Sequence, residues 1–281
     1  MQISVISGSP KGEKSVTFQY VRFLEQAFPD HTFTVVHAGR DIRAIEEREE
    51  VWRGLLATVE DCDGVLWATP VYVMLVPAQL KRFIELIDER NAAEAFSGKY
   101  AACLTTSIRF FDHTAHAYLH GVCDDLGMLY TGFCSAHMED LRNEAFQEQF
   151  ILFFSDFLEA IIERRPVQRV FPPLPAASAC CALKTAPATF PTVAGHKIFR
   201  DEIWGGMRAI FKADDRYYRQ HGLYDFPTRD YPKRIVTRAT SLAMSIPAFR
   251  RDVVEKMPAY MVRPLEKAIE TSTVLAKRRA K

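Results

Sequence analysis

The chain has 281 residues, 48% of them hydrophobic and 25% charged, and a formal net charge of +1, which is typical of a soluble globular protein. No apolar run is long enough to cross a bilayer, so a membrane span is excluded. The first residues lack the basic start and the small-residue cleavage site of a signal peptide, and we therefore expect a cytoplasmic protein.

Strand-like and helix-like segments alternate along the first 165 residues. The expected strands are residues 2–7, 32–37, 64–69, 100–106 and 129–136. The expected helices are residues 15–28, 46–59, 77–91, 115–126 and 144–164. Such alternation predicts an α/β domain with a parallel sheet and helices on both faces. Ligands bind such sheets at the carboxyl ends of the strands.

The remaining sequence divides into two further parts. Residues 166–191 contain six prolines and little periodicity, which predicts a linker or a surface arm. Residues 192–281 return to helical composition without a recognisable motif, and the expected helices there are 203–220, 234–244 and 263–277. Basic residues exceed acidic ones at this end, but the two are interspersed, so nucleic acid is not an expected partner.

The first loop at a strand end, residues 8–17, suits a phosphate group. It runs from an expected strand into an expected helix, whose amino terminus offers free N–H groups and a partial positive charge. Ser9, Ser15 and Thr17 add hydroxyl groups, and Lys11 adds a positive charge. The alternative is an ordinary capped helix that follows a polar turn.

The second loop, residues 68–77, is apolar and bounded by Pro70 and Pro77. At the end of the third expected strand, such a loop could press against a flat aromatic ligand. The alternative is an apolar loop packed on the helix that follows it.

Together the two loops resemble the NADPH-dependent FMN reductase branch of the flavodoxin-like superfamily, over about residues 1–165. The matching motifs are Gly8-Ser9-Pro10-Lys11, Ser15-Val16-Thr17, Thr69-Pro70-Val71-Tyr72 and Ala78-Gln79-Leu80-Lys81-Arg82-Phe83. The resemblance implies a flavodoxin-like five-stranded sheet of order 2-1-3-4-5, FMN as cofactor and NAD(P)H as co-substrate. It also implies a homodimer or homotetramer.

The resemblance further implies which residues bind FMN. The phosphate would fall to Ser9, Lys11, Ser15 and Thr17, and the flavin ring to Pro70, Val71, Tyr72, Val73 and Met74. The loop after the fourth strand would cover the other edge of the ring with Thr105, Thr106, Ser107 and, as a further candidate, Arg109. The chain departs from the family pattern at Val16, where asparagine is common, and at Val73-Met74, which replace a frequent aromatic-glycine pair.

A histidine-rich stretch offers candidates for other chemistry. Asp112, His113, His116, His120 and Cys123 lie close together in sequence, and the last three would share one face of a helix. The spacing could bind a transition metal, but we predict no metal, because such spacings arise often by chance. No catalytic residue is assigned; His113 and His116 are candidates for a proton donor, because imidazole titrates near neutral pH.

The leading hypothesis is therefore an FMN-dependent oxidoreductase that passes electrons from NAD(P)H to a small acceptor such as a quinone. One alternative is an electron carrier like flavodoxin. Another is a flavin-binding regulatory protein that uses residues 192–281 to bind a partner. In the leading hypothesis, residues 192–281 help to join subunits or to cover the flavin. The alternative is that they form a separate helical domain.

Overall fold

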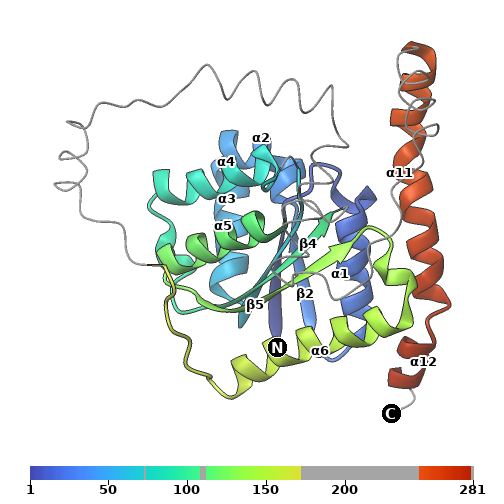
Figure 1. The fold of residues 1–281 in the computed structure, drawn as a ribbon. Helices are drawn as coiled ribbons and strands as arrows, with labels where there is room; N and C mark the ends of the chain where they lie inside the picture. The colour runs from blue at the N-terminus through green and yellow to red at the C-terminus, as the bar shows by residue number, and fades with distance from the viewer. Residues whose placement is uncertain (73, 108–111, 172–246, 280–281) are drawn as a thin grey trace, which may run out of the picture. The chain divides into compact units, whose positions relative to one another are not determined.

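The computed structural model describes residues 1–72, 74–107, 112–171 and 247–279. They contain a five-stranded parallel sheet of order β2-β1-β3-β4-β5, which confirms the predicted flavodoxin-like topology (Figure 1). The strands are β1 (Gln2–Ser7), β2 (Thr32–Val36), β3 (Gly64–Pro70), β4 (Tyr100–Ser107) and β5 (Leu129–His137). The order changes direction between β1 and β3, so the loops after these two strands lie next to each other at the carboxyl edge of the sheet.

The helices that follow the strands keep the predicted alternation, with one correction. They are α1 (Val16–Ala27), α2 (Ala38–Glu47), α3 (Glu49–Glu60), α4 (Ala78–Glu89), α5 (Asp112–Asp125) and α6 (Glu144–Ile162). The single helix expected over 46–59 was wrong, because Arg48 adopts an extended backbone (φ −118°, ψ 111°) that separates α2 from α3. α2 was missed because it is short and mostly polar, and only Ile42 and Ile45 show the apolar spacing of a helix.

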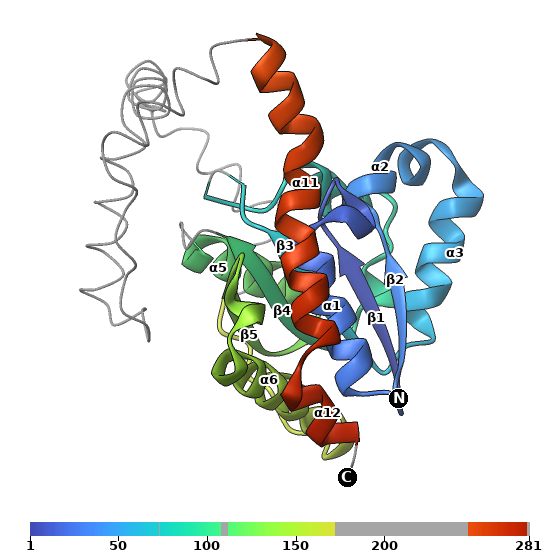
Figure 2. The same ribbon diagram turned by 90° about the vertical axis from the view of Figure 1, so that its right-hand side faces the viewer.

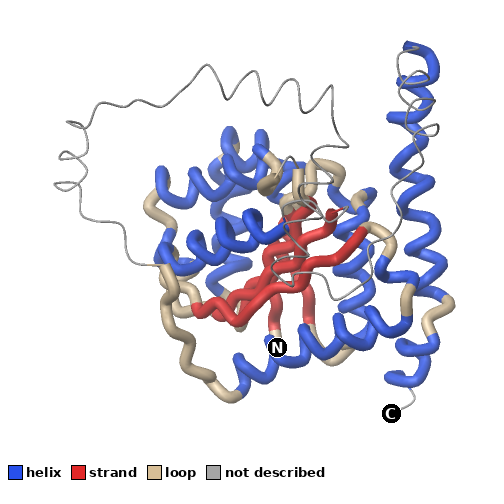
Figure 3. Tube along the Cα trace, viewed as in Figure 1, coloured by secondary structure: helices blue, strands red, loops and turns tan. Residues whose placement is uncertain are grey.

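Helices cover both faces of the sheet (Figure 3), and a hydrophobic core lies on each face. One core joins the sheet to α1 and α6, and the other joins it to α2, α3, α4 and α5. Neighbouring strand residues alternate between them: Val5 belongs to the first core and Ile6 to the second. Both residues are fully buried, as expected for a parallel strand that helices cover on each side.

Two helices near the carboxyl end, α11 (Pro247–Glu270) and α12 (Thr273–Arg279), belong to the same compact unit as residues 1–171. They run beside α1 and α6 (Figure 2). The expected helix 263–277 is interrupted because Ser272 caps α12: its Oγ accepts a hydrogen bond of 3.1 Å from the N–H of Leu275. The expected helices 203–220 and 234–244 lie outside the described residues. Within the described ranges, no helix is both long and apolar enough to cross a membrane.

The start of the expected linker is tied to the domain. The N–H groups of Val170 and Phe171 donate to Oδ2 of Asp124 at 3.0 and 2.8 Å, and Arg169 Nη1 donates to the carbonyl oxygen of Asp124 at 2.7 Å. Asp124 is buried at the end of α5, so these bonds fix the path of residues 169–171 across that helix. Residues 172–191 lie outside the described residues, and the division at 191 stays a prediction.

Candidate functional site

The loop between β1 and α1 is a compact turn that ends in a capped helix. Ser15 is the N-cap of α1, and its side chain accepts a 3.1 Å hydrogen bond from the N–H of Phe18. Ser9 Oγ accepts a bond of 3.3 Å from the N–H of Lys11. Gly12 has a φ of +53°, a backbone conformation that glycine adopts without steric cost. The loop therefore presents hydroxyl groups and the positive end of α1 at the carboxyl edge of the sheet.

This first loop touches the end of β3 closely. The N–H of Gly8 donates to the carbonyl oxygen of Ala68 at 2.8 Å. A Cβ atom added at Gly8 would stand only 2.6 Å from Oγ1 of Thr69 and from a methyl group of Leu80. Glycine at position 8 is thus required for the two loops to lie side by side.

The loop after β3 is a tight turn held from a neighbouring helix. Tyr72 and Leu75 exchange two backbone hydrogen bonds, of 2.8 and 3.3 Å, around the turn. Met74 within it has a φ of +73°, which is uncommon for a residue other than glycine. Its carbonyl oxygen accepts a hydrogen bond from Oγ1 of Thr114 in α5. A strained turn that is anchored in this way is typical of a functional loop.

The end of β4 joins both loops. Oγ1 of Thr106 lies 2.6 Å from Oγ1 of Thr17 in the first turn of α1, and the carbonyl oxygen of Thr106 accepts a 3.0 Å bond from the N–H of Val71. The next residue, Ser107, donates its hydroxyl to Oδ2 of Asp112 at 2.8 Å, and Ser135 also bonds to that oxygen. The three strand ends therefore form one hydrogen-bonded surface.

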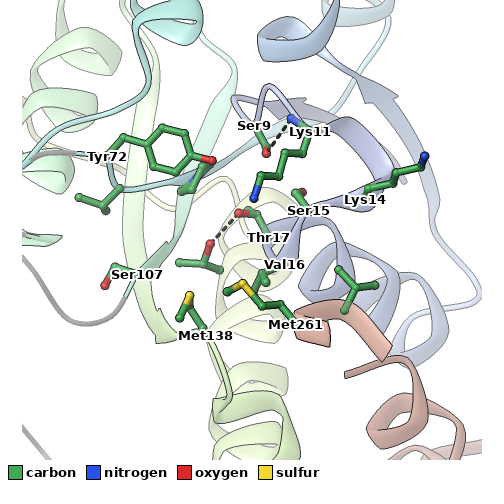
Figure 4. A pocket seen from close by; sticks show the side chains of 14 residues that line it. Ser9, Lys11, Lys14, Ser15, Val16, Thr17, Tyr72, Ser107, Met138 and Met261 are labelled. Atoms are coloured by element: carbon green, nitrogen blue, oxygen red, sulfur yellow. Dashed lines mark hydrogen bonds between the residues drawn. The ribbon is translucent and has the colours of Figure 1, made fainter. Parts of the chain in front are cut away.

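A cavity of about 160 Å³ opens between these loops (Figure 4). Its lining residues are Ser9, Lys11, Lys14, Ser15, Val16, Thr17, Pro70, Val71, Tyr72, Thr106, Ser107, Met138, Met261 and Val262. The residues predicted for the phosphate and those predicted for the ring thus share one cavity. Thr105 and Met74 are not among the lining residues, and Val73 and Arg109 lie outside the described residues.

The cavity is polar on one side and apolar on the other. Lys11 reaches across it towards Thr17, whereas Met138 and Met261 lie together on the opposite side (Figure 4). The Tyr72 ring stands at the edge and remains 41% exposed. Burial raises the pKa of Tyr72, while a hydrogen bond with the side chain of Ser9 lowers it. This arrangement suits a ligand that is anionic at one end and flat and apolar at the other.

The histidines of α5 show no metal site, and one of them is unsuited to donate a proton. Burial lowers the pKa of His116 to about 3, so the ring is neutral near pH 7. Its Nε2 bonds to Oγ1 of Thr105 at 3.0 Å, and the ring stacks on Phe133 at 4.0 Å. The side chain therefore serves packing better than proton transfer. In the described part of the chain, no three His, Cys, Asp or Glu side chains are grouped to hold a metal ion.

Sequence reasoning missed five of the lining residues. Lys14 and Val16 lie inside the first loop, and Met138 follows directly after β5, so their positions alone could have suggested them. Met261 and Val262 come from α11, far along the chain from the sheet, and no motif marks them.

Residues 1–136 match the family model described as NADPH-dependent FMN reductase. No curated protein matches the sequence significantly. The family match confirms the expectations of FMN as the cofactor, of NAD(P)H as the electron donor and of an oxidoreductase.

Several solved structures are similar in fold. FerB from Paracoccus denitrificans, a flavoenzyme NAD(P)H:(acceptor) oxidoreductase, is 22% identical, with a TM-score of 0.49 over 58% of this chain and 97% of that chain. An NADPH-quinone reductase from P. pentosaceus is 15% identical, with a TM-score of 0.42 over 56% and 97% of the two chains. An FMN-dependent NADH-azoreductase from Bacillus anthracis, in complex with FMN, is 13% identical, with a TM-score of 0.40 over 59% and 100%. The sequence motifs and the sheet order agree with the family match: residues 1–136 of this chain match the NADPH-dependent FMN reductase family.

Proposed function

We propose that the chain binds FMN in the cavity between the first two loops and passes electrons from NAD(P)H to a small acceptor such as a quinone. The observation that carries the proposal is the meeting of Lys11 and Ser15 with Pro70 and Tyr72 in one cavity. When bound, the flavin supplies the capacity to accept a hydride and to release electrons. The protein residues contribute binding, orientation and exclusion of water.

The residues of the first loop fit a phosphate group. Lys11 and Lys14 supply positive charge, and α1 leaves its first N–H groups without partners inside the helix. The Ser15 hydroxyl is an acceptor for the N–H of Phe18, and its own hydrogen is free to point to a ligand. The charges and N–H groups on one side of the cavity match the charge of a phosphate monoester.

The second loop fits a flat ring. Pro70 and Val71 present apolar surface, and the bond from Val71 to Thr106 holds that surface against the end of β4. Tyr72 is partly exposed at the edge, where it can contact an incoming nicotinamide or acceptor. Met74 does not line the cavity; its role in this proposal is to shape the turn, because its backbone fixes the position of Tyr72.

The proposal includes assembly into a homodimer or homotetramer, as the family resemblance implies. Large apolar side chains remain exposed on the monomer, among them Phe133, Leu152 and Ile162. Surfaces of this kind are common where subunits meet. Light scattering on the purified protein would give the subunit number.

The test begins with the purified chain and FMN. We expect FMN to bind with micromolar affinity or better, and the loaded protein to oxidise NADH or NADPH when a benzoquinone is added. A carrier would accept electrons from dithionite but would not oxidise NAD(P)H. A regulatory protein would bind FMN and turn over slowly. Absence of binding at millimolar FMN would refute the proposal as a whole.

A further inference from the structure

The wall of the cavity opposite Lys11 includes two residues of α11, which stands outside the part of the chain that matches the family. Met261 and Val262 line the same cavity as Val16 and Met138. We infer that α11 is part of the cofactor site: Met261 and Val262 contact bound FMN, so that FMN binding and the docking of α11 and α12 are coupled. This inference rests on the proposed function.

The docking of these helices is built from apolar packing. Val262, Leu265 and Ile269 are buried and lie along one side of α11, at the spacing of a helix that packs on a core. Leu265 and Ile269 belong to the same hydrophobic core as residues of α1 and α6, and Leu275 of α12 joins them. By contrast, Tyr260 is 75% exposed, so the helix has one bound side and one free side.

A buried polar network links α12 to the loop that carries Met138. Ser272 donates its hydroxyl to Oε1 of Gln147 at 2.5 Å, and Nε2 of Gln147 donates to the carbonyl oxygen of Leu141 at 2.8 Å. The N–H of Leu141 in turn donates to the hydroxyl of Tyr20 at 3.1 Å. Ser272 and Gln147 are both buried, so losing either partner leaves an unpaired group in the core.

The same hydroxyl of Tyr20 donates to the carbonyl oxygen of His137 at 2.6 Å, next to Met138 in the chain. Burial raises the pKa of Tyr20 well above its usual value, so the hydroxyl keeps its proton and this bond persists. One hydrogen-bond network therefore connects Ser272, at the start of α12, to His137, which directly precedes the cavity residue Met138.

Further contacts hold the two helices along α1, whose amino terminus is the proposed phosphate site. Arg22 and Glu266 form an ion pair of 3.8 Å. At the far end of α1, Arg278 Nε donates to the carbonyl oxygen of Ala27 at 2.6 Å, and its guanidinium lies 4.2 Å from the centre of the Phe28 ring. Motion of α11 away from α1 would therefore open the cavity on the side of Met261.

The apolar wall has a clear chemical effect on an anionic ligand. Lys11 and the amino terminus of α1 attract a phosphate more strongly where water is displaced, because the local dielectric constant is lower. Met261, Val262 and Met138 displace that water without adding a charge. The coupling is reciprocal: the free energy by which the docked helix strengthens FMN binding equals the free energy by which bound FMN stabilises the docked helix.

The experiment uses the full chain, freed of FMN and titrated with FMN while the quenching of flavin fluorescence is followed. Met261→Asp places a carboxylate in the wall of the cavity that would hold the anionic FMN, and we expect it to weaken FMN binding by about tenfold or more. Tyr260→Asp adds the same charge one residue away on the exposed side of the same helix and should change the affinity by less than about threefold. Met261→Leu keeps the apolar wall without adding a charge, and should weaken FMN binding much less than Met261→Asp does.

Hydrogen exchange supplies a second readout that does not depend on activity. FMN should slow the exchange of backbone amides in residues 259–279 of the wild type, and should slow it less in Met261→Asp. A wild-type chain that binds no FMN would overturn the proposed function itself. A wild-type chain that binds FMN, with Met261→Asp equal to it in affinity and in exchange, would overturn the present inference and leave the proposed function standing.

Discussion

Oγ1 of Thr17 and Oγ1 of Thr106 lie 2.6 Å apart in the buried floor of the cavity, and their hydrogen bond joins the first turn of α1 to the end of β4. Replacing Thr17 by valine keeps the shape but leaves the Thr106 hydroxyl without this partner, and should cost about 1–3 kcal/mol of unfolding free energy. The double variant Thr17→Val/Thr106→Val should cost clearly less than the sum of the two single variants. Urea unfolding of the four proteins measures the difference, and strictly additive losses would show that the bond contributes nothing.

The phosphate role of the first loop can be separated from helix capping. Ser15 caps α1, and Asn143 caps α6 with a bond to the N–H of Ala145, away from the cavity. Ser15→Ala and Asn143→Ala should each cost about 1 kcal/mol of stability. Only Ser15→Ala should also weaken FMN binding, measured by fluorescence titration. Equal FMN affinities in the two variants would mean that Ser15 acts only as a cap.

The role of Lys11 in binding the phosphate can be tested by comparing FMN with riboflavin, which lacks the phosphate. Lys11→Ala should lower FMN affinity by about 1–3 kcal/mol, because a charge-assisted contact to the phosphate is lost. The loss should shrink as salt is added. Riboflavin, which lacks the phosphate, should bind the variant and the wild type equally. A parallel loss for riboflavin would place Lys11 against another part of the flavin.

The strained turn predicts opposite effects of two substitutions. Met74 has a φ of +73°, so Met74→Gly should leave stability unchanged or raise it by up to about 1 kcal/mol, whereas the β-branched Met74→Val should lower it by more than that. Thermal unfolding measures both. Arg164, with a φ of +52° after α6, is the matched control: Arg164→Gly should stabilise similarly without touching FMN affinity. A destabilised Met74→Gly would show that the side chain contributes packing that outweighs the strain.

Burial of His116 predicts a loss of stability in mild acid. Its pKa of about 3 lies below the ordinary value of 6.5, so the unfolded chain takes up the proton first. The contribution is complete above pH 6.5 and is lost as the pH falls towards 3, by at most about 1.4 kcal/mol per pH unit. His116→Gln, which can keep a bond to Thr105, should flatten the slope of unfolding free energy between pH 6.5 and 5. An unchanged slope would assign the acid sensitivity to other groups, such as His31 or His37, whose pKa values are also lowered.

The parallel sheet could be predicted because most of its strands are apolar runs that alternate with helices of plain apolar spacing, whereas the strand order came from the family resemblance. The two loops could be found because glycine, proline and hydroxyl residues mark the strand ends. α2 escaped because packing against α4, not its own pattern, stabilises a mostly polar helix. The break at Ser272 is a local cap that the prediction overlooked, whereas the bond from Ser272 to Gln147 could not be predicted because the two residues lie far apart in the sequence.

The apolar wall of the site could not be predicted for a related reason. Val262 and Leu265 look like any helix face, and nothing in their spacing states which surface they cover. From the sequence, His116 could be named as a candidate proton donor, because burial, which decides its charge, is a property of the fold.

Because α11 and α12 are synthesised last, the core that they complete stays open during translation. The core shared by α1 and α6 includes Leu265 and Leu275, yet the ribosome completes α6 about 100 residues before it reaches Leu265. At about 5–20 residues per second, the nascent domain spends on the order of 5–20 s with that apolar surface uncovered. A chain stalled in this interval would expose the apolar surface of α1 and α6 that Leu265 and Leu275 later cover. We expect chaperones to bind the nascent chain during this interval.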